Sequence, residues 1–296
     1  MKIKKYAAID IGSNAIRLLI ANVVITKHND PQYKKVSLIR VPIRLGKDVF
    51  TEGKISKGNQ RRMIDAMKAY KLLMDVHQSE RYKAFATSAM RESSNGNKVV
   101  DLIKKETGIE IEIINGEMEA KIISSTDLSD LIDGNKSYLY VDVGGGSTEL
   151  TFFSKGKVVA SKSYKMGTVR LLDKKGTKRT WKEMEHWIKN ESAKVGNVEL
   201  IGSGGNINHI FKHSGNKLGK PLSYIYLNAH YKFLKEMTYE ERISELKLNP
   251  DRSDVIIPAT KIYLSAMKWS GARKVHVPKI GLADGIIKSL HLGVFE

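Results

Sequence analysis

The chain has 296 residues, of which 41% are hydrophobic and 28% charged, the composition of a folded globular protein. It contains no cysteine, which excludes disulfides, thiolate catalysis and cysteine-ligated metals, and fits a reducing compartment. Fifty lysine and arginine residues against 32 acidic residues give a formal net charge of +18. This excess attracts polyanions such as nucleic acid, an anionic membrane or inorganic polyphosphate, although solubility alone explains it equally well.

The length is sufficient for two domains, each with its own core. No apolar run approaches the ~20 residues needed to span a bilayer. The N-terminal segment has neither the apolar core nor the small-residue cleavage site of a signal peptide. We therefore expect a cytoplasmic protein without membrane segments.

Strand-like and helix-like segments alternate along the chain, which predicts an α/β architecture. The strands predicted in the first half are Ile3–Ile9, Arg17–Val24, Lys35–Val41, Tyr82–Ala86 and Ile109–Ile114, with one helix over Lys57–Gln78 and another from about Asn97. The strands predicted in the second half are Tyr138–Val141, Leu150–Phe153, Val158–Tyr164 and Val275–Val277. Its helices are Trp181–Val195, Asn206–His213, one within Arg252–Ser270, and Leu282–Leu292.

The two halves of the chain resemble each other. Each opens with an apolar strand that ends in Asp-x-Gly, followed by a small polar turn and a second strand. The two aspartates, Asp10 and Asp142, are 132 positions apart, which indicates a duplication of domain size. Two facing copies would form a cleft between them, where ligands usually bind.

Each of these turns is suited to holding a phosphate. Small residues let the backbone bend so that several N–H groups converge on one anion, and hydroxyl and amide side chains add donors. The predicted phosphate-binding residues are Gly12, Ser13, Asn14, Gly144, Gly145, Gly146, Ser147 and Thr148. The alternative is a pair of ordinary glycine-containing hairpin turns, which two matching copies make less attractive.

The aspartates at the strand ends predict a cation beside the phosphate. A carboxylate repels a phosphate unless a cation lies between them, and Mg²⁺ takes carboxylate oxygens and keeps waters. Other phosphate and metal motifs are missing from the sequence: there is no G-x-x-x-x-G-K-[ST], and the turn glycines lead into strands rather than helices. No H-E-x-x-H pair or His-Asp dipeptide supports a zinc or HD-type site.

Further motifs accompany the turns. They include Arg44-Leu-Gly46, Ala86-Thr-Ser-Ala-Met-Arg91, Gly116-Glu-Met-Glu119-Ala120, Asp142-Val-Gly-Gly-Gly-Ser-Thr-Glu149, Met166-Gly-Thr-Val-Arg170, Gly202-Ser-Gly-Gly205 and Gly281-Leu-Ala-Asp-Gly285. From end to end the chain resembles the exopolyphosphatase/guanosine pentaphosphate phosphohydrolase (Ppx/GppA) family of the actin-like superfamily. The Thr-Ser-Ala-x-Arg and Glu-Ala segments narrow the resemblance from the superfamily to this family.

The resemblance implies the short, two-domain form of the family. The expected fold is two ribonuclease H-like domains of the actin-like ATPase superfamily with a cleft between them. The first would comprise residues 1–121 plus 281–296, where a last helix returns to it, and the second residues 122–280. A homodimer is left open by the sequence.

The resemblance also implies roles for matched residues. Glu119 aligns with the catalytic glutamate that orients or deprotonates the attacking water, and Arg91 with an arginine that contacts phosphate. Asp142, Gly144 and Glu149 align with residues important for metal and phosphate binding. The predicted metal ligands are therefore Asp10, Asp142 and Glu149, with Mg²⁺ or Mn²⁺ as the cofactor. Without the resemblance, Arg91 would be interpreted as an inter-element salt bridge and Glu119 as an exposed helix residue.

Three departures from the family pattern leave the strength and the target of catalysis open. Met118 replaces a glutamate, Lys121 replaces an arginine that lysine cannot imitate in bidentate binding, and Ala15 replaces a hydroxyl residue. The leading hypothesis is an exopolyphosphatase that releases orthophosphate from inorganic polyphosphate. The alternative is a guanosine pentaphosphate phosphohydrolase; an actin-like ATPase or kinase and a non-catalytic polyphosphate or nucleotide sensor are further possibilities.

The charge excess generates one more hypothesis. Basic residues outside the catalytic turns would hold the tail of a long polyphosphate, and neither a membrane nor a nucleic acid is the expected partner. The candidates are Lys174, Lys175, Lys178, Arg179 and Lys182. The competing interpretation treats these side chains as an ordinary solvated face.

Overall fold

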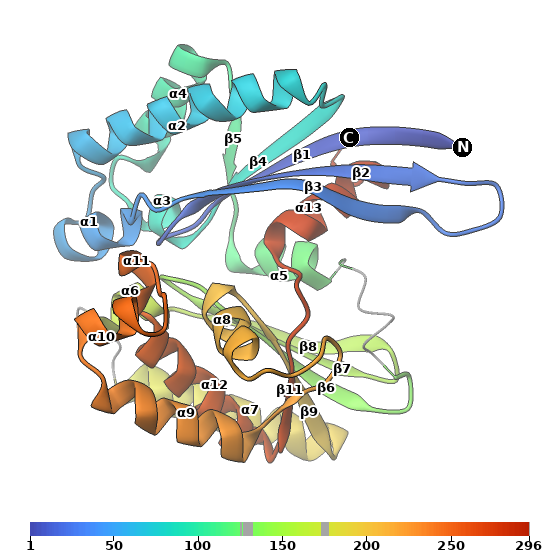
Figure 1. Cartoon of the computed structure of the whole chain (residues 1–296), viewed down its shortest axis with the longest axis vertical. Helices are drawn as coiled ribbons and strands as arrows, with labels where there is room; N and C mark the ends of the chain where they lie inside the picture. The colour runs from blue at the N-terminus through green and yellow to red at the C-terminus, as the bar shows by residue number, and fades with distance from the viewer. Residues whose placement is uncertain (125, 127–132, 173–177, 296) are drawn as a thin grey trace. The chain divides into compact units, whose positions relative to one another are not determined.

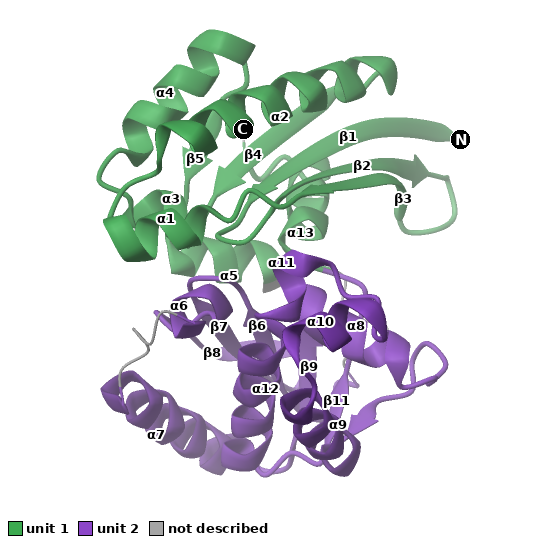
Figure 2. Ribbon diagram, turned by 60° about the vertical axis from the view of Figure 1, so that its left-hand side comes forward, with its two compact units in different colours: residues 1–126, 281–296 green, residues 127–280 purple. Residues whose placement is uncertain are grey.

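The computed structural model describes residues 1–124, 126, 133–172 and 178–295. The chain divides into two compact units, residues 1–126 with 281–296 and residues 127–280 (Figure 2). The first unit extends five residues beyond the predicted domain end at 121. The reason is that helix α5 (Gly116–Ser124) lies beside the returning helix α13 (Leu282–His291) of the same unit (Figure 1).

The first unit is built on a five-stranded sheet in the order β3-β2-β1-β4-β5. The first three strands are antiparallel, and β4 and β5 run parallel to β1. The strands are β1 (Lys2–Ile11), β2 (Ile16–Ile25), β3 (Gln32–Val41), β4 (Arg81–Ala86) and β5 (Ile111–Ile113). The other helices of this unit are α1 (Leu45–Glu52), α2 (Lys57–Val76), α3 (Ser88–Glu92) and α4 (Gly96–Thr107).

The second unit is built on a six-stranded sheet in the order β10-β11-β9-β6-β7-β8. Its strands are β6 (Ser137–Val143), β7 (Thr148–Ser154), β8 (Lys157–Tyr164), β9 (Val198–Ser203), β10 (Leu222–Ser223) and β11 (Lys274–His276). Its helices are α6 (Thr168–Leu172), α7 (Lys178–Val195), α8 (Gly205–His213), α9 (Tyr224–Glu236), α10 (Tyr239–Ser244), α11 (Pro250–Ser253) and α12 (Ile256–Ser270). Helix α12 packs among α7, α8, α9 and strand β6.

The two sheets repeat one topology. In each, three antiparallel strands lead to helices and then to a fourth strand that pairs in parallel with the first. A further strand, β5 in one sheet and β11 in the other, extends the parallel part. The predicted α/β fold class, with duplicated domains of ribonuclease H-like order, is therefore confirmed.

The first strand of each sheet lies at the centre of its unit. Residues 6–11 of β1 are all buried, as expected for a strand covered on both faces of its sheet. The edge strands β3 and β8 are instead exposed and carry lysines and no acidic residue, a composition that discourages pairing with another chain. The buried central strands thus place Asp10 and Asp142 at fixed points in each unit.

Two helices illustrate how local sequence sets the boundaries. Helix α2 begins after Ser56, whose hydroxyl accepts a hydrogen bond from the Asn59 N–H at 3.3 Å. Helix α13 begins after Gly281, whose N–H donates to the Asp284 carboxylate at 3.0 Å. Asp284 also pairs with Lys35 of β3 at 2.7 Å, which attaches the returning segment to the first sheet.

No helix in the described parts of the chain is long and apolar enough to cross a membrane.

The contact between α5 and α13 predicts the effect of a single methyl group. A Cβ atom on Gly285 would lie 2.2 Å from the Ile122 carbonyl oxygen. We expect Gly285→Ala to lower the free energy of unfolding by about 1–3 kcal/mol, because the two helices must move apart. Gly58→Ala is the control, since its Cβ meets no atom within 4 Å. Chemical denaturation of both variants tests this, and equal stability of Gly285→Ala and wild type would contradict the close packing.

Candidate functional site

The turn between β1 and β2 is closed by its own backbone. The N–H of Gly12 donates to the carbonyl of Ala15 at 3.1 Å. The segment after β3 then donates hydrogen bonds to the carbonyl groups of the turn. The Gly46 N–H donates to the Ser13 carbonyl at 2.7 Å, and the Arg44 N–H donates to the Asn14 carbonyl at 3.0 Å. Two carbonyl groups of this turn are therefore directed toward the segment that opens α1.

The turn between β6 and β7 repeats this arrangement. The N–H of Gly144 donates to the carbonyl of Ser147 at 3.0 Å. The segment after β8 again donates hydrogen bonds to the carbonyl groups of the turn. The Thr168 N–H donates to the Gly144 carbonyl at 3.0 Å, and the Val169 N–H donates to the Gly145 carbonyl at 2.8 Å. The side chain of Arg170 completes the set by donating from Nε to the Gly146 carbonyl at 2.9 Å. We call residues 166–170 the buttress of the second turn.

The buttress needs a glycine where it touches the turn. A Cβ atom on Gly167 would lie 2.3 Å from the Gly146 nitrogen and 2.4 Å from the Gly145 carbonyl carbon. No side chain fits at that distance, so Gly167 permits the backbones to meet. The hydroxyl of Thr148, which is fully buried, donates to the Met166 carbonyl and adds a further link. Thr148 therefore supports the turn and does not direct this proton at a phosphate.

In the second turn, the carbonyl groups and the N–H groups of the peptides have different hydrogen-bond partners. The carbonyls of Gly144, Gly145 and Gly146 are occupied by the buttress. Within the described residues, the N–H groups of Gly145 and Gly146 donate no backbone hydrogen bond. Successive N–H groups of a turn in this state form a concave site that attracts anions. The predicted phosphate-binding role of the turn thus has a geometric basis.

The side-chain donors of the first turn are partly engaged inside the unit. Ser13 is buried, and its hydroxyl shares a hydrogen bond of 2.9 Å with the hydroxyl of Ser88 at the start of α3. Its backbone N–H forms no bond with another backbone group of the described residues. The first turn therefore offers backbone donors, as the second does, while Ser88 fixes the side chain of Ser13.

The two strand-end aspartates have different cross-strand neighbours. In the first sheet Asp10 pairs in register with Arg17, and Arg17 Nη1 lies 2.8 Å from Asp10 Oδ2. In the second sheet Asp142 pairs in register with Glu149, so two carboxyl groups share one face at the same place. Glu149 is buried and accepts a hydrogen bond of 3.0 Å from the Ser163 hydroxyl. The sequence reasoning missed Arg17, although its position opposite Asp10 follows from the length of the turn.

A buried tyrosine lies near each aspartate. Burial raises the pKa of the Tyr70 hydroxyl above its ordinary value, and the Asp10 carboxylate raises it further. Burial and the Asp142 carboxylate likewise raise the pKa of Tyr263, against a hydrogen bond to the Val143 backbone that lowers it. Both hydroxyls are therefore protonated donors at neutral pH: Tyr70 donates to the Ile16 carbonyl at 3.2 Å, and Tyr263 to the Ser203 carbonyl.

Arg91 and Glu119 belong to the first unit and are connected through one segment. Arg91, at the end of α3, donates from Nη1 to the Ile114 carbonyl at 2.6 Å. Ile114 directly precedes the segment that opens α5, where Glu119 is buried with 8% of its surface exposed. The alternative interpretation of Glu119 as an exposed residue is therefore wrong. A guanidinium has several donors, so the bond to Ile114 leaves Arg91 capacity for an anion.

The described residues contain no group of three or more histidine, aspartate or glutamate side chains that could by itself hold a metal ion. The second turn instead provides one pair of carboxylates, Asp142 and Glu149. This set suits a hard cation such as Mg²⁺ or Mn²⁺ better than a softer ion such as Zn²⁺, because Mg²⁺ commonly uses one or two carboxylates and completes its shell with waters and substrate phosphates.

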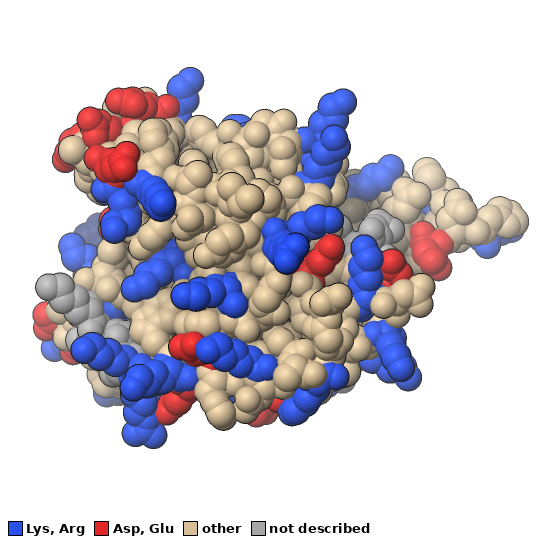
Figure 3. All heavy atoms as spheres, turned by 90° about the horizontal axis from the view of Figure 1, so that it is seen from below, with Lys and Arg blue, Asp and Glu red and all other residues tan. Residues whose placement is uncertain are grey.

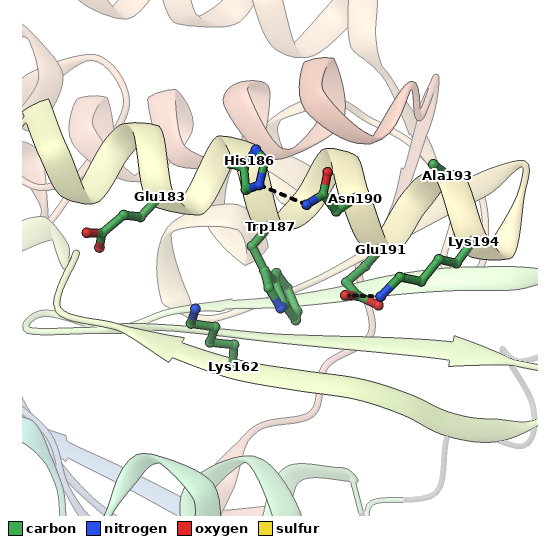
Figure 4. Close-up of a pocket in the computed structure, with 8 residues that line it drawn as sticks. All are labelled: Lys162, Glu183, His186, Trp187, Asn190, Glu191, Ala193 and Lys194. Atoms are coloured by element: carbon green, nitrogen blue, oxygen red, sulfur yellow. Dashed lines mark hydrogen bonds and ion pairs between the residues drawn. The ribbon is translucent and has the colours of Figure 1, made fainter.

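A groove of about 430 Å³ lies elsewhere on the second unit, between β8 and α7 (Figure 4). Trp187 lies within it; on its wall Lys194 forms an ion pair with Glu191 at 2.7 Å, and the side chains of His186 and Asn190 share a hydrogen bond of 2.9 Å. None of the predicted site residues lines this groove. We therefore place the candidate site at the turns and not in this groove.

Comparison with known families gives one match over most of the chain. The model described as the Ppx/GppA phosphatase family matches residues 24–293. The chain is 34% identical over 175 residues to a bifunctional 3-dehydroquinate synthase/phosphatase of Fusobacterium nucleatum, covering 57% of this chain and 26% of that protein. It is 32% identical over 179 residues to exopolyphosphatase 2 of Mycobacterium tuberculosis, covering 59% and 56% respectively.

A third relative carries a different name. The guanosine-5'-triphosphate,3'-diphosphate pyrophosphatase of Vibrio vulnificus is 29% identical over 168 residues, which cover 57% of this chain and 33% of that protein. The chain thus matches between about a quarter and just over half of the length of these relatives.

Solved structures match over the full length. The Ppx/GppA family member of Aquifex aeolicus superposes with a TM-score of 0.78 at 27% identity, covering 100% of both chains. An exopolyphosphatase from Cytophaga hutchinsonii gives a TM-score of 0.85 over 98% of both chains, and its 24% identity supports the fold alone.

The buttress provides a test of the turn geometry. We expect Gly167→Ala to lower the free energy of unfolding by roughly 1–3 kcal/mol, because its Cβ would overlap the backbone of Gly145 and Gly146. Thermal and chemical denaturation measure the change. Gly134→Ala, whose Cβ has no atom within 4 Å, is the control in the same unit. A Gly167→Ala protein as stable as the control would show that the buttress does not fix the turn.

Proposed function

The chain belongs to the Ppx/GppA phosphatase family, and we propose that it hydrolyses terminal phosphoanhydride bonds and releases orthophosphate from the ends of inorganic polyphosphate. The observation that carries this proposal is the pair of matching turns, each with its carbonyls turned away and backbone N–H groups left for an anion. A relative named exopolyphosphatase supports the choice of substrate.

We propose Mg²⁺ or Mn²⁺ as the cofactor, held in the second unit by Asp142 and Glu149. The two carboxyl groups lie in register on one face across β6 and β7, and a divalent cation such as Mg²⁺ is commonly held by one or two carboxylates. When bound, the ion would neutralise phosphate oxygens during in-line displacement. Asp10 has the Arg17 guanidinium beside its carboxylate, so its role as a metal ligand stays a prediction.

In the proposed reaction, the oxygen of a water molecule attacks the terminal phosphorus, and the bond to the bridging oxygen breaks. Orthophosphate and a polyphosphate shorter by one phosphate are the products. Glu119 would accept the proton of the attacking water, and Arg91 would stabilise the phosphoryl oxygens. Glu119 is buried, with 8% of its surface exposed.

Guanosine pentaphosphate is the second candidate substrate. It also ends in a phosphoanhydride, and the Vibrio vulnificus relative is named for this class of nucleotide. The same turns and the same water-activating carboxylate would serve both substrates, so the two activities differ in what binds beyond the terminal phosphate.

The role of Glu119 is tested by its neutral isostere. We expect Glu119→Gln to lower kcat by about 10²–10⁴-fold with little change in polyphosphate affinity, because the amide cannot accept the proton of water. Phosphate release under saturating substrate measures kcat, and a binding assay measures affinity. Glu117→Gln, on the exposed side of the same helix, is the matched control. A Glu119→Gln variant that keeps most of its kcat would reject the assignment.

The proposed cation predicts a divalent requirement. Phosphate release should stop in excess EDTA and return with Mg²⁺ or Mn²⁺ better than with Ca²⁺, since the two carboxylates form a small hard-oxygen site. Asp142→Asn should lose most of the metal-dependent rate, while Asp101→Asn on the exposed surface of α4 should not. Full activity of wild type in EDTA would contradict the metal.

The five residues of the predicted polyphosphate track lie at the start of α7 and in the segment before it. Lys174 and Lys175 lie outside the described residues, and Lys178, Arg179 and Lys182 lie in the first turns of α7. Arg179 is paired with Glu183 at 2.8 Å. Figure 3 shows lysine and arginine side chains spread over one face with acidic groups among them, and not gathered in one continuous patch.

Salt dependence distinguishes the two substrates. If the basic side chains hold a long chain, KM for polyphosphate should rise steeply with salt, because each neutralised phosphate releases counterions. KM for guanosine pentaphosphate should rise less, and neutralising Lys174, Lys175, Lys178, Arg179 and Lys182 together should flatten the polyphosphate dependence. Equal salt slopes for both substrates, unchanged by the neutralisation, would favour the nucleotide as the substrate.

A further inference from the structure

Tyr263 lies behind the strand end that carries Asp142. It belongs to α12, is fully buried, and donates its hydroxyl hydrogen bond to the Ser203 carbonyl at the end of β9. Ser203 is the register partner of Asp142 in the parallel pair of β6 and β9. The hydroxyl of Ser203 is itself bonded to the Ile280 carbonyl at 3.0 Å. Ser203 is thus held at both its main chain and its side chain.

Gly204 shows how close the tyrosine lies to the carboxylate. A Cβ atom on Gly204 would lie 3.4 Å from Asp142 Oδ1 and 3.5 Å from the Tyr263 hydroxyl. It would also lie 3.2 Å from the Val143 carbonyl oxygen. The backbone at Gly204 has a φ of +112°, a conformation that glycine favours. The α-carbon of Gly204 therefore occupies the narrow space where the ends of β6 and β9 and the hydroxyl of α12 meet.

We infer that Tyr263 is a positioning residue: by fixing the end of β9 against the end of β6, it holds the Asp142 carboxylate in the orientation that binds the divalent cation. This inference rests on the proposed metal role of Asp142. The tyrosine side chain is fully buried, and its hydroxyl donates to the Ser203 carbonyl. Without that donor a buried carbonyl loses its partner, and the strand ends can shift.

The simpler alternative is that Tyr263 only contributes to the core. Tyr138 separates the two explanations, because it is buried to a similar degree at the opposite end of the same strand β6. Its hydroxyl accepts a hydrogen bond of 3.2 Å from the Asp133 N–H. Tyr138→Phe therefore loses one buried hydroxyl and one hydrogen bond of the same unit, without affecting the strand end at Asp142.

The test measures Mn²⁺ binding by the free-ion electron paramagnetic resonance signal, in the substrate-free full chain. We expect Tyr263→Phe to weaken Mn²⁺ binding by roughly tenfold, the effect typical of groups that orient metal ligands. Tyr138→Phe should lower thermal stability yet leave Mn²⁺ affinity within about twofold of wild type. Ser203→Ala, which keeps the carbonyl that accepts from Tyr263, should also retain the affinity.

In a kinetic assay, Tyr263→Phe should change the Mg²⁺ requirement without lowering the maximum rate. In phosphate release, the Mg²⁺ concentration for half-maximal rate should rise in Tyr263→Phe, while kcat at saturating Mg²⁺ stays within roughly threefold. Mn²⁺ affinity equal to wild type in Tyr263→Phe, or Mn²⁺ binding that survives Asp142→Asn, would overturn the inference. A wild type that binds Mn²⁺ through Asp142 but cleaves neither substrate would instead reject the proposed function and leave this inference standing.

Discussion

The structure of the candidate site depends on one constraint: the carbonyl groups of each Asp-x-Gly turn must accept hydrogen bonds from the segment that follows the third strand of the same unit. In the second unit Thr168, Val169 and Arg170 supply these bonds, and in the first unit Arg44 and Gly46 do so. With the carbonyls fixed, the peptide planes of the turn have one orientation, and their N–H groups face the other way. An anion site made of backbone dipoles needs this orientation before the ligand arrives, because reorienting peptides on binding would reduce affinity.

The two units use the same frame with different charges. The register that joins Asp10 to Arg17 in the first sheet joins Asp142 to Glu149 in the second. One unit therefore has an arginine beside the aspartate, and the other has a second carboxylate, which is the pair that we propose to hold the divalent cation. A duplicated fold has in this way acquired two turns with unlike chemistry, which explains why the metal is proposed for one unit only.

Much of this organisation could be predicted from local sequence. The apolar strands, the Asp-x-Gly spacing and the length of the turns were enough to predict two related sheets, because these signals lie within a few residues of each other. Helix α9 (Tyr224–Glu236) was missed, although Ser223 accepts from the Tyr226 N–H at its start. Its aromatic residues and histidine have no strong helical preference, so tertiary packing against α12 decides its structure.

The parts of the site that sequence could not reveal are contacts between distant segments. The motifs around Arg44 and Arg170 were visible in the chain without a physical role, and only the fold shows them bracing the turns. The tie between Tyr263 and Ser203 joins residues 60 positions apart and leaves no periodic signal. Arg17 could have been found by counting the register across the turn from Asp10.

The central claim is that the turn amides are a preformed phosphate site. Amide-resolved NMR of the perdeuterated chain, titrated with orthophosphate in the presence of Mg²⁺, tests it most directly. We expect the amide signals of Ser13, Gly145 and Gly146 to shift saturably, while those of Gly58 and Gly134 remain in place. Saturable shifts elsewhere in the chain, with the signals of the three turn amides unmoved, would contradict it.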